Sequence, residues 1–350
     1  MVLLRFFKAV LFYGSEFFLM FFMNSKYLKF EILYLFKTLF FIFIIFGPIT
    51  SPLAKPLESK EPIRIIKNNW SSQIVLSMIL GEIFSRRGYT VEYAELTTLK
   101  QWGRLHRGHE HVQVEVWEGT MKEDFERVSQ FGNILDVGNH DAKTREEWWY
   151  PSYIEKLCPG LPDWRALQKC AGIFKTPHSN KKGRYVAGPW EKPDEARIRA
   201  LDLNFVAMPV KNADQLWIEL DKAYKIQKPI VLFNWSPNWI ESRYEGKFIE
   251  FPKYETLCET DSKWGINTTK THDCGNPKGG WLKKAAWKGM EKKWPCALEI
   301  FRDMNFSNSM ISKVAALVDA DGKNPKEAAK IWLNENKDKW KYWGRDACSK

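Results

Sequence analysis

The chain has 350 residues, a formal net charge of +11 and 27% charged residues. Aromatic residues make up a further 15%, a composition that excludes a disordered protein and an all-helical membrane bundle. Tryptophan is unusually frequent, with 17 residues. All of them lie between Trp70 and Trp343, so they belong to the part of the chain that follows an apolar N-terminus.

Residues 1–54 have the pattern of a targeting segment. They are mostly apolar and aromatic, and a polar patch follows Met23, which could be the true start. Counted from Met23, three lysines form a basic region, Thr38–Phe46 forms an apolar core, and Ala54 ends a cleavage site. A retained anchor is the alternative, but the apolar core is short for a membrane span. We therefore expect a signal peptide cleaved near Ala54 and a periplasmic product.

The charge that remains after cleavage bears on the partners of the protein. Removing residues 1–54 takes away five basic and two acidic residues and leaves a formal charge of +8. The lysines are scattered among acidic residues, and no nucleic-acid-binding motif accompanies them. We therefore expect solvated basic faces and no nucleic-acid partner.

Six cysteines follow the targeting segment, a pattern that favours disulfides in an exported protein. Two pairs flank short loops that they could close, and the last two cysteines could pair by elimination, so the full connectivity stays open. These pairs are Cys158 with Cys170, Cys258 with Cys274, and Cys296 with Cys348. A zinc site is the alternative, but neither Cys-x-x-Cys nor Cys-x-x-His spacing occurs. We expect neither a metal nor a cofactor.

Predicted strands and helices alternate after residue 60. Short β-branched or alternating runs predict strands at 63–66, 91–96, 112–116, 184–186 and 229–233. Helical spacing of apolar residues predicts helices from Ser71 to Gly88, over 194–200 and around 216–224. The alternation predicts an α/β fold with mixed, mostly parallel sheets.

Four tryptophans follow predicted strands closely: Trp70, Trp117, Trp190 and Trp235. The carboxyl ends of parallel strands form the edge where ligands bind, so we expect these indoles to meet in one cleft. Packing is the alternative for each of them taken singly. Packing on helix faces is the interpretation for Trp281, Trp287, Trp294 and Trp332.

An indole-lined cleft suits two classes of ligand. Indole rings stack on sugars, and their faces attract alkylated ammonium groups through cation–π contacts. Few arginines lie near the four tryptophans, which favours a small aromatic box over a sugar site.

Four segments carry a further pattern: Glu115–Gly119, Gly188–Trp190 with the following Asp-Glu-Ala-Arg, Phe233–Trp239 and Pro277–Trp281. Together they resemble the periplasmic substrate-binding proteins of glycine betaine/proline-type ABC importers. The resemblance covers about residues 62–345. It implies a type II binding protein with two α/β lobes and a hinge, no enzymatic activity, and a monomer that serves a membrane permease and its ATPase.

The resemblance also implies a ligand site. The box tryptophans are Trp117, Trp190 and Trp235, with Trp70 matching the choline-type branch. The sequence lacks the Gly-Trp-Gly-Cys turn and the histidine that hold the carboxylate in the best-known glycine betaine members, since Met121 stands at the histidine position.

The stretch Thr144–Pro151 resembles the corresponding stretch in one branch of this family. Members of that branch bind trimethylamine N-oxide between four tryptophans and a glutamate. Glu146 or Glu147 is the candidate glutamate, and Trp148 is a further candidate. The expected ligand is a small methylated amine, either trimethylamine N-oxide or glycine betaine.

The expected lobes are 60–145 with 245–345, and 146–244, with hinge crossings near 141–145 and 243–247. An exported carbohydrate-acting enzyme is the alternative function, with its acids drawn from Glu118, Asp124, Glu191 and Glu241. We interpret the segment that holds His106, His109 and His111 as a solvated loop and not as a metal site.

Overall fold

The computed structural model describes residues 58–348, and the predicted targeting segment lies outside this range. The first elements are β1 (Ile63–Lys67), α3 (Ser71–Arg86), β2 (Val91–Glu95), α4 (Thr98–His106), β3 (Val112–Trp117) and α5 (Glu118–Ser129). The isoleucine-rich β1 is largely buried, and α3 packs on β1 and β3 through its apolar residues. Helix α4 begins where the Thr97 side chain accepts a hydrogen bond from the backbone N–H of Lys100.

A second group of strands and helices repeats this order. It consists of β5 (Gly183–Ala187), α7 (Asp194–Ala200), β6 (Phe205–Pro209), α8 (Ala213–Lys225) and β7 (Leu232–Ser236). Short elements surround the group: η1 (Ser152–Lys156), α6 (Arg165–Cys170), η2 (Ala171–Phe174), η3 (Ile240–Ser242), β8 (Gly246–Phe248) and α9 (Leu257–Thr260). Each group therefore places its first strand between two parallel partners, β2 and β3 around β1, and β6 and β7 around β5.

Two long antiparallel strands, β4 (Ile134–Pro151) and β9 (Lys278–Trp287), join the groups into one mixed sheet. Its order is β2-β1-β3-β9-β4-β7-β5-β6, with β8 paired to β4. Strand β4 pairs with β9 from Ile134 to Arg145 and with β7 from Arg145 to Trp149, so it belongs to both sides. We call β2, β1, β3 and β9 with their helices the β1 half, and β7, β5 and β6 with theirs the β5 half.

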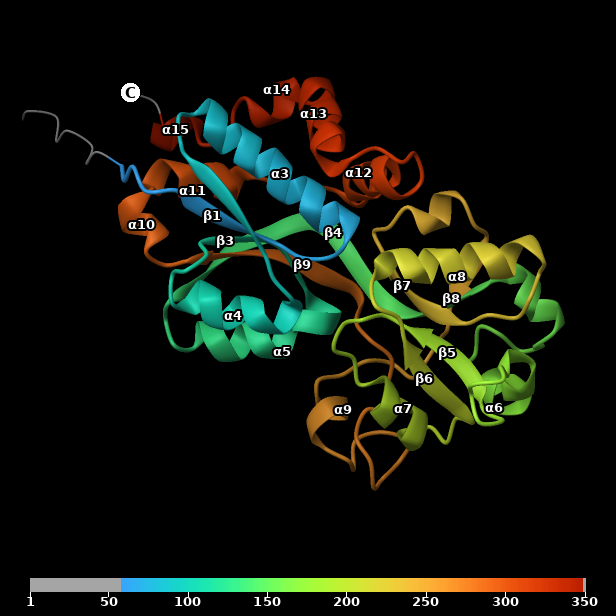
Figure 1. Ribbon diagram of the computed structural model, residues 1–350. Coiled ribbons are helices and arrows are strands. Elements are labelled where there is room, and N and C mark those ends of the chain that lie inside the picture. Colours follow the sequence, from blue (N-terminus) through green and yellow to red (C-terminus); the bar gives the residue numbers. More distant parts are fainter. Residues whose placement is uncertain (1–57, 349–350) are drawn as a thin grey trace, which may run out of the picture. The chain divides into compact units, whose positions relative to one another are not determined.

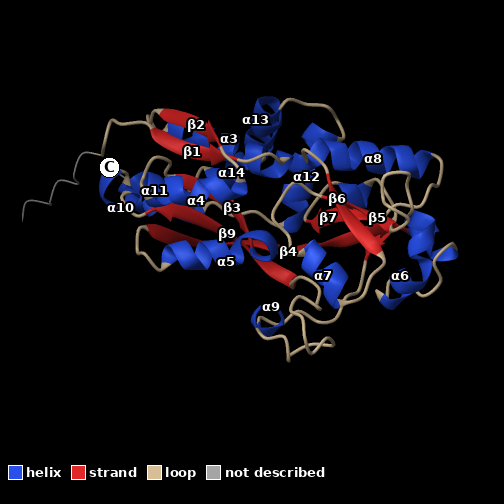
Figure 2. Cartoon of the chain, turned by 60° about the horizontal axis from the view of Figure 1, so that its bottom comes forward, coloured by secondary structure: helices blue, strands red, loops and turns tan. Residues whose placement is uncertain are grey.

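Helices cover both faces of the strands in the β1 half. Figure 1 shows α3 on one side of these strands and α4 with α5 on the other, and Figure 2 gives a second view of the same elements. This is the arrangement that right-handed crossovers produce when the chain moves first from β1 to β2 and then back past β1 to β3.

The C-terminal helices complete the β1 half. They are α10 (Met290–Lys293), α11 (Pro295–Asp303), α12 (Asn308–Asp319), α13 (Pro325–Glu335), α14 (Lys337–Trp340) and α15 (Arg345–Cys348). Helices α12 and α13 pack on α3. The buried Lys284 of β9 donates to the backbone carbonyls of Phe301, Arg302 and Met304 at 3.0, 2.6 and 2.5 Å, which satisfies the carboxyl end of α11.

The α/β class and the mixed sheet are confirmed, and the predicted helix at 194–200 coincides with α7. Two details are corrected. The strand predicted at 229–233 lies further on, as β7 from Leu232 to Ser236. Trp281 and Trp287 lie in β9 and not on helices, and both are partly buried on the same face of the strand as Lys283.

Three disulfides join the predicted pairs, Cys158–Cys170, Cys258–Cys274 and Cys296–Cys348. Within residues 58–348, no helix combines the length and the hydrophobicity needed to cross a membrane.

Candidate functional site: an indole-lined cavity

A cavity with about 280 Å³ of empty space, counting its opening to solvent, lies between the β1 half and the β5 half. Five of its eight lining residues are aromatic. The lining residues are Trp70, Trp117, Thr120, Met121, Glu146, Trp190, Phe233 and Trp235. All four tryptophans predicted from strand ends therefore reach one cavity.

The topology of the sheet explains why these indoles meet. Trp70 and Trp117 directly precede α3 and α5, at the carboxyl ends of β1 and β3. The chain leaves β1 toward β2 on one side while β3 lies on the other, and such a switch point opens a crevice at the strand ends. Trp190 follows β5, and Trp235 lies near the end of β7, at the matching switch point of the β5 half.

The rings form a connected aromatic wall. Trp190 stands edge-on to Trp70, with ring centroids 6.0 Å apart and planes at 86°. It is also edge-on to Trp235, at 5.2 Å and 85°. Phe233 packs against both Trp190 and Trp235, at 5.6 and 5.8 Å. These contacts hold the indoles at steep angles to one another, so that they surround a volume and do not stack together.

Three of the four indole N–H groups, those of Trp70, Trp117 and Trp190, donate to protein acceptors. Trp70 and Trp117 donate to the same oxygen, Oε2 of Glu115, at 2.7 and 2.9 Å. Trp190 donates to the side-chain oxygen of Asn69 at 3.0 Å. Because the polar edges of these rings are occupied, what the rings offer a ligand is their π-faces.

Glu115 lies behind the aromatic wall and is fully buried. Burial raises the pKa of its carboxyl to about 7, although hydrogen bonds from Trp70, Trp117 and Ser72 act in the opposite direction. The sequence analysis did not single out Glu115 as a site residue. Glu115 lies two residues before Trp117 on the same strand, and residues two apart on a strand share a face. This spacing could have identified Glu115 as a neighbour of the site.

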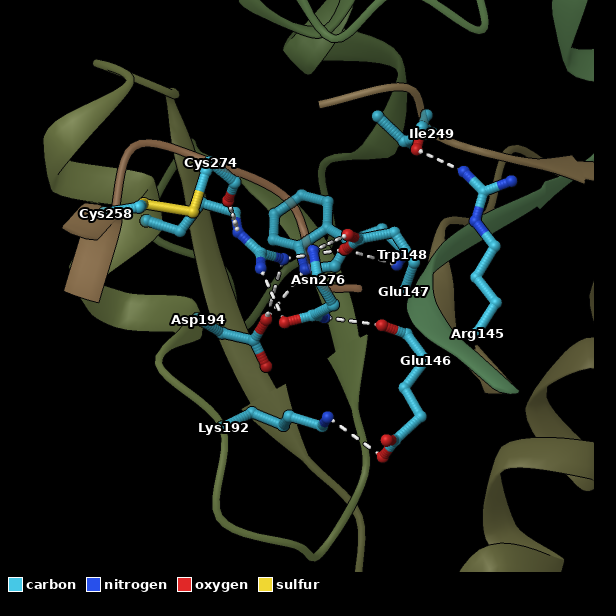
Figure 3. Close-up of polar contacts among 11 residues, drawn as sticks. Arg145, Glu146, Glu147, Trp148, Lys192, Asp194, Ile249, Cys258, Cys274 and Asn276 are labelled. Atoms are coloured by element: carbon cyan, nitrogen blue, oxygen red, sulfur yellow. Dashed lines mark hydrogen bonds and ion pairs between the residues drawn. A yellow bond between two sulfur atoms is a disulfide. The ribbon is translucent and has the colours of Figure 1, made fainter. Parts of the chain in front are cut away.

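Glu146 is the acidic residue of the cavity wall. Its Oε1 accepts hydrogen bonds from Thr120 and from Nζ of Lys192, the latter at 3.0 Å (Figure 3). Both partners of the Lys192–Glu146 ion pair are only 5% exposed. Its other oxygen, Oε2, is buried and has no hydrogen-bond partner among residues 58–348. Glycine at position 119 permits this placement, because a Cβ there would lie 2.6 Å from Oε2.

Glu147 and Trp148 lie beside the cavity but outside its lining. Glu147 forms a buried ion pair with Arg197 at 2.7 Å and accepts the backbone N–H of Asn276 at 2.8 Å. Trp148 stacks on Tyr185 at 3.8 Å and donates to Asp194 at 2.8 Å (Figure 3). This network anchors the middle of β4 to α7 and to the segment before β9. Of the two candidate glutamates, only Glu146 reaches the cavity.

The acids named for the alternative enzyme do not form a pair. Glu118 accepts the backbone N–H of Trp281, and Asp124 pairs with Arg127 within α5. Glu191 accepts from Thr98, and Glu241 accepts from Ser236. None of the four lines the cavity, so the carbohydrate-acting alternative has no structural support.

The interpretation of the three histidines as a solvated loop was wrong, because His106 is the last residue of α4 and His111 is buried. His111 accepts the backbone N–H of Arg64 at 2.9 Å and packs on Trp294, while His106 packs on Phe131. No group of three or more His, Cys, Asp or Glu side chains suited to a metal ion occurs among residues 58–348.

Comparison with solved structures gives the same fold. A glycine betaine/L-proline-binding protein, ProX from Borrelia burgdorferi, has a TM-score of 0.64 and 19% identity, covering 81% of this chain and 96% of that one. Lactococcal OpuAC, crystallised closed with glycine betaine, has a TM-score of 0.61 and 19% identity, covering 81% and 99%. The chain therefore shares the two-lobed fold of these proteins.

Comparison of sequences assigns the chain to a family. Residues 61–335 match the OpuAC family, the substrate-binding domain of ABC-type glycine betaine transport systems. The trimethylamine N-oxide-binding protein of Pelagibacter ubique is 36% identical over 297 residues, which are 82% of this chain and 92% of that protein. The chain belongs to this family of substrate-binding domains. Its members bind small quaternary amines and work with the permease and ATPase of an importer.

Proposed function

We propose that this protein captures trimethylamine N-oxide or a closely related methylated amine and delivers it to an ABC importer. The observation that carries the proposal is the cavity itself, in which four indoles surround a space with one carboxylate in its wall. Each indole face in contact with a methylated nitrogen contributes roughly 0.5–2 kcal/mol. The Pelagibacter relative, named for trimethylamine N-oxide binding, supports this ligand class.

In this proposal Glu146 determines which of the two expected ligands binds more tightly. Its Oε2 has no partner among the described residues, so in the proposed complex it is the polar atom that meets the ligand. A carboxylate repels the carboxylate of glycine betaine, whereas it can share with an N-oxide oxygen one proton that the complex takes up from solvent on binding. We therefore propose trimethylamine N-oxide as the preferred ligand and glycine betaine as the weaker one.

The proposed binding cycle is closure of two lobes around the ligand. Residues 60–145 form most of one lobe and 146–244 most of the other, with β4 as the first crossing near 141–145. We place the return crossing at 277–280 and not at 243–247. The reason is that Arg197 holds the carbonyl of Cys274 and the side chain of Asn276, which keeps this segment with the β5 half.

In this proposal the protein carries out no chemistry and is a monomer in the periplasm, exported by cleavage near Ala54. Ligand contacts from both lobes stabilise the closed form, which is the form a permease recognises.

Calorimetric titration tests the proposed function. We expect the mature protein to bind trimethylamine N-oxide more tightly than glycine betaine, choline, proline betaine or dimethylsulfoniopropionate. Replacing Trp117 or Trp235 with Ala should weaken binding at least about tenfold, because one desolvated ring face is lost. Glu146→Gln should weaken trimethylamine N-oxide binding while reducing the discrimination against glycine betaine. Absence of binding to all five compounds would refute the proposal.

A further inference from the structure

The carboxylate of Glu115 connects two walls of the cavity that come from different parts of the sequence. Trp70 precedes α3 and Trp117 precedes α5, yet both indoles donate to one oxygen atom of Glu115, Oε2. Ser72 donates to the same oxygen at 3.2 Å. The relative orientation of the two rings is therefore tied to a single acceptor.

Apart from Ser72 and the two indoles, the described polar side chains around Glu115 do not bind its carboxylate. Its Oε1 is buried and unpaired within residues 58–348. The adjacent polar side chains are neutral amides bonded to one another: Gln113 accepts from Gln73 at 2.9 Å and donates to Asn68 at 2.8 Å. These amides are buried, so solvent does not replace the carboxylate as an acceptor for the indoles.

We propose that Glu115 is a positioning residue for ligand binding, which fixes the faces of Trp70 and Trp117 toward the cavity without touching the ligand. A cation–π contact depends on the ring face lying toward the cation, so an indole that rotates about its side-chain bonds loses it. Two hydrogen bonds to one buried oxygen restrict both rings at once. The rings are thus held in the binding orientation before ligand arrives, which lowers the ordering cost of binding.

The amide variant separates this role from simple filling of the core. Glu115→Gln keeps a carbonyl oxygen that can accept both indole N–H groups, and its NH₂ group takes the place of the unpaired Oε1. Glu115→Ala removes the acceptor. Glu110→Gln is a matched control, because Glu110 is also buried, precedes β3 and bonds to Arg104 without contacting the cavity lining.

The first measurement needs no ligand and so does not depend on the proposed function. In ¹⁵N spectra of the indole N–H groups, assigned with Trp70→Phe and Trp117→Phe, we expect both resonances to be protected from solvent exchange. Both should shift together in Glu115→Gln and stay unchanged in Glu110→Gln. A shift of only one indole resonance, or of neither, in Glu115→Gln would overturn the shared-acceptor arrangement. This measurement does not require Glu115→Ala to fold.

The second measurement is the dissociation constant for trimethylamine N-oxide and rests on the proposed function. We expect Glu115→Ala to bind at least about tenfold more weakly and Glu115→Gln to stay within about threefold of the parent protein. Glu110→Gln should bind normally. Folded Glu115→Ala with the parent affinity, or Glu115→Gln as weak as Glu115→Ala, would overturn the positioning role. A parent protein that binds no methylated amine refutes the proposed function instead, while the indole spectra still decide the arrangement.

Discussion

The indole of Trp70 lies 2.7 Å from Oε2 of Glu115, although the two residues are 45 positions apart in the sequence. Trp70 is the residue directly before α3, and Glu115 lies on β3, which α3 covers. The hydrogen bond therefore fixes a ring of the cavity to the central sheet and not to a loop. A site supported in this way keeps its geometry in the absence of ligand.

Gly119 provides a direct test of the cavity wall. A Cβ at this position would lie 2.6 Å from Oε2 of Glu146, so Gly119→Ala must displace the carboxylate. We expect about tenfold weaker binding of trimethylamine N-oxide, although alanine is favoured over glycine within α5 by up to about 1 kcal/mol. Calorimetric titration with a thermal melt checks both effects.

Gly172→Ala is the control for this substitution, because the nearest atom to a Cβ there is 3.9 Å away. It should leave affinity and stability nearly unchanged. Equal affinities of the parent and Gly119→Ala would show that Glu146 does not contact the ligand.

The contact between Thr98 and Glu191 joins the two halves at 2.6 Å. Thr98 begins α4 in the β1 half, and Glu191 directly follows the cavity residue Trp190. If closure traps the ligand, Thr98→Val should raise the dissociation rate and weaken binding about three- to tenfold. Stopped-flow tryptophan fluorescence measures the dissociation rate.

Thr269→Val is the matched control, since within residues 58–348 the Thr269 hydroxyl bonds only to Asn267, at 2.8 Å and in the same loop. It should dissociate at the parent rate. A Thr98→Val rate equal to that of the control would remove this contact from the closing mechanism.

The disulfide Cys258–Cys274 supports the site indirectly. Its second cysteine lies next to the segment that holds Arg197 and Glu147, through the carbonyl of Cys274 and the backbone of Asn276. Replacing both cysteines with serine should cost about 3 kcal/mol of unfolding free energy for a loop of this length. Because Asn276 then loses its anchor, affinity should also fall about threefold or more.

The disulfide Cys158–Cys170 closes a loop of similar length, with a separation of 12 residues against 16. Its removal should lower stability by a similar amount and leave affinity unchanged. Denaturant unfolding and titration of both variants compare the two effects. An equal change in affinity for the two variants would contradict the proposed anchoring.

We expect the buried His140 to make the folded protein less stable in acid. Burial lowers its pKa from 6.5 to about 3, and its ring nitrogens contact the carbonyl of Val114 and the backbone N–H of Phe306. Between these pKa values the unfolded chain binds a proton that the folded protein excludes. The free energy of unfolding therefore falls as the pH drops below about 6.5, by at most about 1.4 kcal/mol per pH unit from this group.

Glu115 acts in the opposite direction, because its raised pKa means that the folded protein takes up a proton between about 7 and 4.5. The two contributions are separated by comparing the parent with His140→Gln in urea unfolding at several pH values. We expect the variant to lose less stability on acidification. The exposed His109 serves as the control through His109→Gln, and identical pH profiles of all three proteins would contradict the role of His140.

The strand-end tryptophans could be predicted because the connection from strand to helix is a local pattern. Trp70 and Trp117 precede α3 and α5 as expected, and α7 has its predicted bounds. The choice between Glu146 and Glu147 could not be made from sequence. Residues 146–151 of β4 are all buried, so the alternation that normally marks one face of a strand is absent.

Ion pairs between residues far apart in the sequence could not be predicted either. Lys192 reaches Glu146 from 46 positions away, and Arg197 reaches Glu147 from 50. These pairs depend on β4 and β7 being neighbours, which the sheet order decides. Phe233, in contrast, could have been found, since it lies two residues before Trp235 on one strand and so shares its face.

Strand β4 pairs with both halves, and Glu146 lies just past the point where its partner changes from β9 to β7. In a molecule that opens and closes, such a position is the fulcrum and moves least. In the proposed closing motion, the indoles of the two halves would move apart on opening, while the carboxylate would stay near the pivot. We therefore expect Glu146 to offer an arriving solute a contact whose position changes little between the open and closed forms.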